Sequence, residues 1–329
     1  MDDLDFIWSK MRNFASAKIS EMTLSAIQQR VKPWVMPLAI VLGALFHNYI
    51  AYFAFLTPYL IFSMLFLTFS RLEIRELRFS RGMWAVLAVQ IIGALVIFIP
   101  LRYVNASMAQ ALFITVYCPV ATAAPVVTGM LGGKIGKVAA FSVLSNLAVA
   151  VSAPLLLPVV NPGADDSTSY FEEFTTISLR VAPMIVFPLF FALILRFTSP
   201  KVNTFVQHCA PVSFYLWSIS LIIVVGKSVS FVLMEPPAYW PVMAAMAAGA
   251  AACCGLLFAI GKKIGATEGD AISLGQSLGQ KNTILGIWLA LTYLNPVASV
   301  GPAAYVVWQN CFNSFQIYRM SRTKKACKC

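Results

Sequence analysis

The sequence predicts an all-α polytopic membrane protein, with ten transmembrane helices arranged as two inverted five-helix repeats. Three observations lead to this fold class: the composition, a series of ten apolar segments, and a likeness between the two halves of the chain. Hydrophobic residues make up 59% of the 329 residues, charged residues make up 11%, and the mean hydropathy is +0.78. These values lie far from those of soluble domains, so the composition indicates a membrane protein.

Ten apolar segments follow one another along the chain, with short polar breaks between them. A helical span needs about 20 apolar residues, so the chain has room for roughly ten spans in one integral membrane domain. Ten such segments do not fit into a soluble fold of this size. The segments are residues 33–47, 50–70, 83–101, 107–131, 137–160, 174–197, 211–234, 238–261, 270–293 and 296–318.

Polar segments flank this transmembrane domain of residues 33–318. Residues 1–32 begin with acidic MDDLDF and then mix apolar residues with lysines. We expect them to remain uncleaved as a cytoplasmic segment, either an amphipathic helix on the membrane surface or a short cytosolic helix. Residues 319–329 are a basic cytoplasmic tail ending in Cys327 and Cys329, for which lipidation or metal capture is the alternative to a plain disordered tail.

Lysine and arginine concentrate on one side of the predicted membrane. Twenty of the 24 fall in the N-terminal segment, in alternate loops or in the C-terminal tail. The opposite loops have only Arg102 and Arg180, together with an acidic stretch at 165–173. The positive-inside rule therefore predicts cytoplasmic termini, and we expect a bacterial inner (plasma) membrane. This topology accounts for the net charge of +11 without a nucleic-acid partner.

The two halves of the chain resemble each other where RVKPWVMPLAIVLGALF begins at Arg30 and RVAPMIVFPLFFALILRF begins at Arg180. Both have an arginine-valine pair and a proline three residues after the arginine, and the copies are 150 residues apart. Five predicted spans lie in each half, so the second copy enters the membrane from the opposite side, as in inverted repeats over about 33–161 and 174–318. Chance matching of apolar sequence is the alternative, because Pro37 and Pro188 differ by one position in register.

The fourth and ninth predicted spans correspond under this repeat, and both contain helix-interrupting residues. In the fourth, Pro119 and Pro125 each remove a backbone donor, so carbonyls without partners are expected between them. In the ninth, Gly275 and Gly279 weaken the helix. The ninth span also has polar side chains at Gln276, Ser277, Gln280, Lys281 and Asn282. Paired discontinuous helices indicate the central binding site of a transporter.

With these breaks, the chain from about Lys32 to Tyr318 resembles the bile acid:sodium symporter family. Gln280 matches a glutamine of the family's ninth helix, with Gln276 at the position of a glutamate and Lys281 at that of an asparagine. The resemblance implies crossing fourth and ninth helices and secondary active transport of small or amphipathic organic anions by alternating access. It also implies that the fourth, fifth, ninth and tenth spans rock against the remaining helices.

Further positions extend the resemblance to the family's sodium sites. Pro119 and Thr122 match its fourth helix, whereas Ala124 and Pro125 replace a Ser-Asn pair. The implied candidate sodium ligands are Gln90, Gln276, Gln280, Ser142 and Asn146. Each of these polar residues would alternatively form a hydrogen bond to a neighbouring helix.

Lys281 is the departure with the largest electrostatic consequence. Sodium prefers carboxylate, carbonyl and hydroxyl oxygens, but here the carboxylate is replaced by Gln276 and an ammonium is added. Lysine at membrane depth costs roughly 2.5 to 3.5 kcal/mol. It would hold an anionic substrate, exchange protons in a proton-coupled carrier or uniporter, or snorkel to one interface. Glu268 and Asp270 are predicted to cap the ninth span rather than bind an ion.

The sequence favours a carrier over the other classes of membrane protein. An enzyme is not expected, because His47 and His208 lie near span ends without matching carboxylates. A channel or receptor would share the helix count but not the paired breaks. An efflux permease for an oxyanion such as arsenite is the closest rival, since Cys118 lies beside the fourth-helix break. The expected partners are the lipid bilayer and a small organic anion, sodium is the one candidate cofactor, and the oligomeric state is left open.

Overall fold

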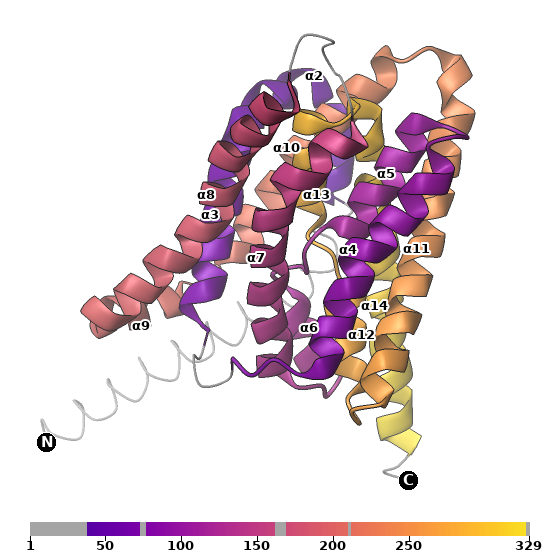
Figure 1. The fold of residues 1–329 in the computed structure, drawn as a ribbon. Helices are drawn as coiled ribbons and strands as arrows, with labels where there is room; N and C mark the ends of the chain where they lie inside the picture. Colours follow the sequence, from indigo (N-terminus) through magenta and orange to yellow (C-terminus); the bar gives the residue numbers. More distant parts are fainter. Residues whose placement is uncertain (1–37, 73–76, 162–168, 210–211, 327–329) are drawn as a thin grey trace, which may run out of the picture.

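The computed structural model describes residues 38–72, 77–161, 169–209 and 212–326. Within these ranges the chain forms helices joined by turns, with one isolated antiparallel bridge between Val120 and Lys281 (Figure 1). The prediction of an all-α protein is thus confirmed for this part of the chain. The N-terminal segment, residues 30–37 of the first repeat copy, and the tail cysteines Cys327 and Cys329 lie outside the described residues.

Six helical stretches of the described chain are long and apolar enough to cross a membrane, which supports an integral membrane protein. The first, His47–Ser70, comprises α2 (His47–Ile50), η1 (Ala51–Leu56) and α3 (Thr57–Ser70). The others are α4 (Arg81–Leu101), α7 (Ile135–Val160), α8 (Tyr170–Thr198), Tyr215–Met234 within α10 (Val212–Met234), and Pro237–Ala266, formed by η3 (Pro237–Tyr239) and α11 (Trp240–Ala266).

The remaining helices are shorter or less apolar. Two predicted spans, the fourth and the ninth, are each divided into two helices. The bounds are α5 (Ala106–Tyr117), α6 (Ala124–Met130), α9 (Pro200–His208), α12 (Ala271–Gly279), α13 (Thr283–Tyr293), η4 (Pro296–Ser299) and α14 (Val300–Ala326), and residues 38–45 are also helical.

Polar side chains mark where several helices begin. The Ser80 hydroxyl accepts a hydrogen bond from the Met83 amide at the start of α4, and the Asn105 side chain accepts one from Met108 at the start of α5. Ser169 forms a capping box at the start of α8. These residues satisfy backbone donors that a helix leaves unpaired in its first turn, so they fix the ends of the spans.

The helices pack in two groups, which meet chiefly where α7 packs on α8 and also where α10 packs on α13. In the first helix group, α3 packs on α8 and α10, α10 packs on α2, and α9 packs on α8. In the second, α4 packs on α5, α6 and α12 pack on α7, and α11 packs on α12, α14 and α5, with α13 against α14. The third and eighth predicted spans, α4 and α11, pack with the broken helices.

Glycines explain why α11 lies so close to α12. A Cβ atom at Gly261 would lie 2.5 Å from the carbonyl oxygen of Leu274, and one at Gly265 would meet the backbone of Asp270. Small residues allow membrane helices to approach backbone to backbone. The glycines of the eighth predicted span therefore allow α12 to pack directly on α11.

The connections lie at two ends of the bundle. Figure 1 shows the start of α4 and the α6–α7 and α11–α12 connections at the same end as the last turns of α14, with the α4–α5 and α10–α11 connections at the other. We call the first end the basic end, because the helix termini there include Arg81, Lys134, Lys137 and Lys263.

Candidate functional site

Two broken helices cross in the second helix group. α5 ends at Tyr117 and α6 begins at Ala124, while α12 ends at Gly279 and α13 begins at Thr283. We call the intervening residues 118–123 and 280–282 the crossing. There the Asn282 amide donates to the Pro119 carbonyl (2.7 Å) and the Ala121 amide to the Gln280 carbonyl (3.0 Å). Irregular backbone is tolerated at membrane depth only when it is satisfied in this way or lines a cavity.

The long helix that follows each break supplies a side-chain oxygen, which accepts a hydrogen bond from a backbone amide of that break. The Val120 amide donates to Ser145 Oγ on α7 (3.2 Å), and the Lys281 amide donates to Gln309 Oε1 on α14 (2.9 Å). Val120 and Lys281 are also the two residues of the bridge. The two breaks are therefore held by equivalent contacts.

The carbonyl groups at the ends of α5 and α12 each accept a hydrogen bond from a side chain of a neighbouring helix. Gln90 Nε2 on α4 donates to the Tyr117 carbonyl (2.9 Å), and the Tyr305 hydroxyl on α14 donates to the Gly279 carbonyl (2.7 Å). Ser145 Oγ also donates to Gln90 Oε1 (2.8 Å). Sequence reasoning selected Gln90 but missed Ser145, Gln309 and Tyr305, because each lies in an apolar segment without a local motif.

Lys281 lies at the centre of the crossing. Its side chain is 1% exposed, and its Nζ has no hydrogen-bond partner and no carboxylate within ion-pair distance among the described residues. The nine-residue α12 separates it from the basic end by about 14 Å of helix. This burial does not fit the alternative in which the Lys281 side chain reaches an interface, because the whole side chain lies inside the protein.

The other predicted residues of the ninth span surround this lysine in sequence and are also buried. Gln280 Nε2 donates to Gln276 Oε1 (2.6 Å), which leaves Gln276 Nε2 without a partner in the described chain. Ser277 Oγ is likewise buried and without a partner there. Asn282 caps α13, since its Oδ1 accepts from the Leu285 amide (3.3 Å). The polar atoms of α12 that remain available can thus donate hydrogen bonds.

The predicted helix-breaking residues have different positions. Pro119 lies within the crossing, whereas Pro125 lies in the first turn of α6, where a proline is well tolerated. Gly279 is the last residue of α12 and lies against the Phe258 ring. The prediction of a break at Gly275 is wrong: it lies inside α12, where a Cβ atom would be 2.6 Å from Lys262 Cγ, so it serves close packing on α11.

The candidate residues of the fourth and fifth spans are Thr122, Ser142 and Asn146. Thr122 is half-buried within the crossing. Ser142 and Asn146 are both buried on α7, and Asn146 Nδ2 donates to the Ser142 carbonyl (2.8 Å). Asn146 Oδ1 is without a partner in the described residues. Of the candidate sodium ligands, Gln90 and Gln276 already accept a hydrogen bond at the amide oxygen.

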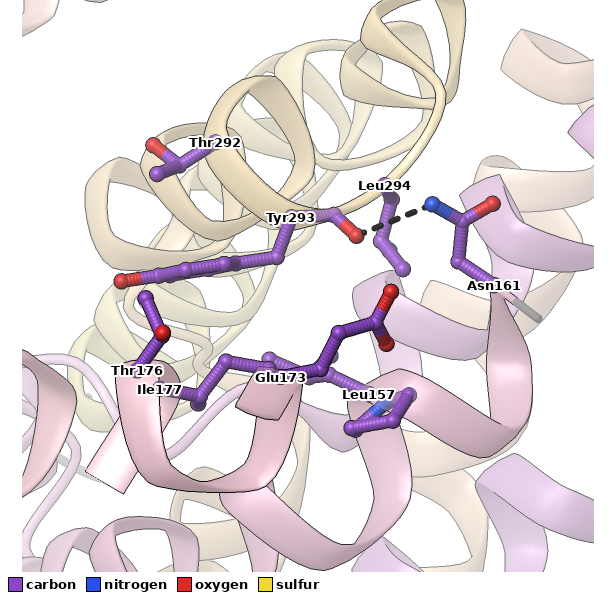
Figure 2. Close-up of a pocket in the computed structure, with 9 residues that line it drawn as sticks. Leu157, Asn161, Glu173, Thr176, Ile177, Thr292, Tyr293 and Leu294 are labelled. Carbon is purple, nitrogen blue, oxygen red and sulfur yellow. Dashed lines mark hydrogen bonds between the residues drawn. The ribbon is translucent and has the colours of Figure 1, made fainter. Parts of the chain in front are cut away.

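A pocket of about 230 Å³ lies away from the crossing. It is lined by residues from the ends of α7 and α13 and from the first turns of α8 (Figure 2). None of the residues predicted for the site lines it. The crossing itself is closed in this structure, since Gln276, Ser277, Gln280 and Lys281 are all buried.

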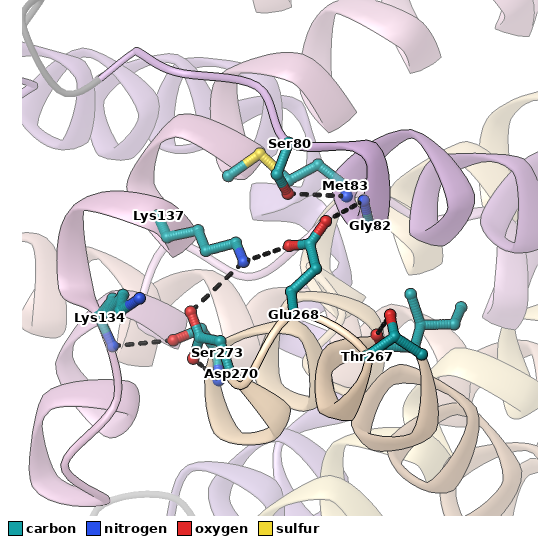
Figure 3. Close-up of polar contacts among 10 residues, drawn as sticks. Ser80, Gly82, Met83, Lys134, Lys137, Thr267, Glu268, Asp270 and Ser273 are labelled. Atoms are coloured by element: carbon teal, nitrogen blue, oxygen red, sulfur yellow. Dashed lines mark hydrogen bonds and ion pairs between the residues drawn. The ribbon is translucent and has the colours of Figure 1, made fainter.

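An ionic cluster closes the basic end of the second helix group (Figure 3). Lys137 Nζ on α7 lies 2.7 Å from Glu268 Oε2 and 3.4 Å from Asp270 Oδ2. Glu268 Oε1 also accepts from the Gly82 amide (2.6 Å) at the start of α4. The hydrogen bond from Lys137 lowers the pKa of the Glu268 carboxyl to about 2. The cluster thus ties α4, α7 and the α11–α12 connection together.

Asp270 also caps α12. Its Oδ1 accepts from the Ser273 amide (3.3 Å), so the capping prediction is confirmed for this residue. Ser273 Oγ in turn accepts from the Lys134 amide (2.8 Å), which fixes the start of α7 against the start of α12.

A comparison with protein-family models and with curated proteins finds no match to this chain.

Proposed function

We propose that the protein is a secondary active transporter of small or amphipathic organic anions, with the anionic group of the substrate bound by Lys281 at the crossing. The observation that carries this proposal is a buried ammonium group without a partner in the described chain, located between two broken helices. Broken helices with their ends at mid-membrane are the usual construction of a transporter's substrate site.

The energetics of Lys281 favour a functional explanation. A lysine at membrane depth costs about 2.5 to 3.5 kcal/mol, and a buried charge is normally paired. No such pairing offsets the cost among the described residues. An anionic ligand would supply the missing countercharge, so the lysine is better explained by binding than by folding.

The neighbouring polar atoms also favour an anion over sodium. Gln276 Nε2 and Lys281 Nζ are donors without partners in the described residues, and Ser277 Oγ is able to donate. Sodium needs several oxygen acceptors, but the amide oxygens of Gln90 and Gln276 already accept hydrogen bonds, so among the candidate sodium ligands Asn146 Oδ1 is the buried amide oxygen that remains without a partner in the described residues. We therefore propose that transport does not require sodium.

Ten spans in two inverted repeats are part of the same proposal. The equivalent contacts of Val120 with Ser145 and of Lys281 with Gln309 support a two-fold relation between the halves. The grouping of basic helix termini at one end supports a cytoplasmic assignment for that end. With an even number of spans both termini are cytoplasmic, in a bacterial inner membrane.

Alternating access would use the two helix groups. The second group carries the crossing as a unit, because the Lys137 cluster and the glycine contacts of α11 tie its helices together. Rocking of this unit against α3, α8 and α10 would expose Lys281 first to one side of the membrane and then to the other.

The arsenite-type alternative depends on Cys118, and its surroundings favour a packing role. Cys118 Sγ donates to the Ile114 carbonyl (2.8 Å) and lies against Gly286 of α13. A thiol engaged in this way fills space between two half-helices.

Counterflow in proteoliposomes tests the proposal. Vesicles preloaded with an unlabelled organic anion should take up the labelled anion saturably and without sodium, and Lys281→Gln should abolish the uptake. Uptake that rises linearly with concentration would indicate a channel, and uptake that needs sodium and survives in Lys281→Gln would contradict the lysine-centred site.

A further inference from the structure

The pocket in Figure 2 lies where the two helix groups meet at the end opposite the basic end. Its walls come from α7 and α13 of the second group and from α8 of the first. Its apolar part includes Leu157, Ile177 and Leu294, and its polar part includes Asn161, Glu173 and Tyr293. At about 230 Å³ it is smaller than the ~300–1,000 Å³ of drug-sized ligand sites, so it fits a small molecule.

Glu173 gives the pocket its charge. It is half-buried, and within the described part of the chain it has no ion-pair partner. The nearest arginine on α8 is Arg180, which lies seven residues or about 10 Å of helix from Glu173, and its charge acts on the Tyr293 hydroxyl. A carboxylate at the wall of a mostly apolar pocket favours a cationic ligand.

The other polar groups are divided between those already engaged and those available. Asn161 is engaged twice, because its Nδ2 donates to the Tyr293 carbonyl (3.2 Å) and its Oδ1 accepts from Gln110 Nε2 (3.0 Å). The Tyr293 hydroxyl is buried and has no partner among the described residues. Figure 2 shows the Tyr293 ring lying above Thr176 and Ile177, with the Glu173 carboxylate to one side of the ring, toward Leu294 and Asn161. The pocket therefore presents an aromatic face and a carboxylate together.

We propose that this pocket binds a small organic ammonium ion. The ammonium group lies between the Glu173 carboxylate and the face of the Tyr293 ring, which attracts cations through its quadrupole. The hydrocarbon part lies against Leu157, Ile177 and Leu294. The site is separate from the crossing and of opposite charge preference, and the proposal does not depend on transport by Lys281.

Thermal stabilisation of the purified full-length protein tests this site with two probes of nearly equal shape, benzylammonium and benzyl alcohol. Ligand binding raises the melting temperature through mass action. Benzylammonium should stabilise the protein saturably and benzyl alcohol much less. In Glu173→Gln the Kd for benzylammonium should rise about tenfold, and in Tyr293→Leu it should rise several-fold.

Matched variants separate the pocket from general charge effects. Glu172→Gln removes the adjacent carboxylate, which belongs to the α8 cap and does not line the pocket, so it should leave the Kd unchanged. Arg180→Gln removes the nearest arginine on α8 and should lower the Kd. Lys281→Met should have no effect on benzylammonium. Equal stabilisation by benzyl alcohol, or an unchanged Kd in Glu173→Gln, would overturn the proposal.

Discussion

Lys137 and Lys281 belong to the same helix group but have opposite surroundings. Lys137 lies at the basic end, 14% exposed, between Glu268 and Asp270, and holds three elements together. Lys281 lies at the crossing, 1% exposed, with no partner for its ammonium group in the described chain. The first lysine is explained by the fold, because its charge is compensated. The second is not, and this difference is the basis for assigning it a ligand.

The comparison predicts that replacing the two lysines has opposite effects on stability. Lys281→Met keeps most of the volume and removes a buried charge, so the free energy of unfolding should rise by about 1 to 3 kcal/mol. The same variant should lose anion affinity by about 100-fold, because a charge-assisted hydrogen bond contributes about 1.5 to 3 kcal/mol. Denaturation and anion titration of the same sample measure both effects. A destabilised variant with normal anion affinity would remove the distinction between the lysines.

Lys137→Met should destabilise the protein by about 2 kcal/mol. The substitution leaves the Glu268 and Asp270 carboxylates near each other without a countercharge, and partial exposure limits the cost. Anion affinity at the crossing should change little. The stability difference should shrink at 1 M salt, since exposed electrostatic interactions are screened there. A difference independent of salt would show that packing and not charge determines the role of Lys137.

Gly279 directly precedes the crossing, and Gly279→Ala tests whether its close packing against Phe258 positions the crossing. The added Cβ atom would collide with the Phe258 ring, so about 1 to 3 kcal/mol of stability should be lost, together with some anion affinity. Gly255→Ala is the matched control, because a Cβ atom there would make an ordinary 3.4 Å contact with Phe312. Equal melting temperatures for the two variants would contradict the packing argument.

The smallest expected effect concerns pH. The pKa of Glu268 is lowered from its ordinary value of 4.5 to about 2, so its contribution to stability is fully present above about pH 4.5 and is lost as the pH falls toward 2. The melting temperature of the original chain should therefore fall more steeply between pH 5 and pH 3 than that of Glu268→Gln. Parallel curves for the two proteins would show that the Lys137–Glu268 pair does not form in solution.

The two breaks were predictable from sequence, whereas their partners were not. Pro119 and the polar run from Gln276 to Asn282 are local signals, and the helices do end beside them. Ser145, Gln309 and Tyr305 satisfy the crossing from helices 25 to 28 residues away along the chain, and no local pattern encodes those contacts. Gly275 was misinterpreted because a packing glycine and a helix-breaking glycine look the same in sequence.

The grouping of the helices also required tertiary information. The long apolar runs of α4 and α11 identify them as spans but do not indicate which neighbours they pack against. Contacts such as Gly261 with Leu274 and Glu268 with Gly82 assign both helices to the group of the crossing. The pocket beside Glu173 was not foreseen for the same reason, since three separate helices form it.

The most direct measurement is thermal stabilisation of the purified protein by a panel of organic anions, each with and without sodium, for the original chain and for Lys281→Met. We expect stabilisation by at least one anion in the original chain, unaffected by sodium and absent in the variant. Stabilisation that requires sodium and persists in Lys281→Met would contradict the account and restore a sodium-coupled site at the crossing.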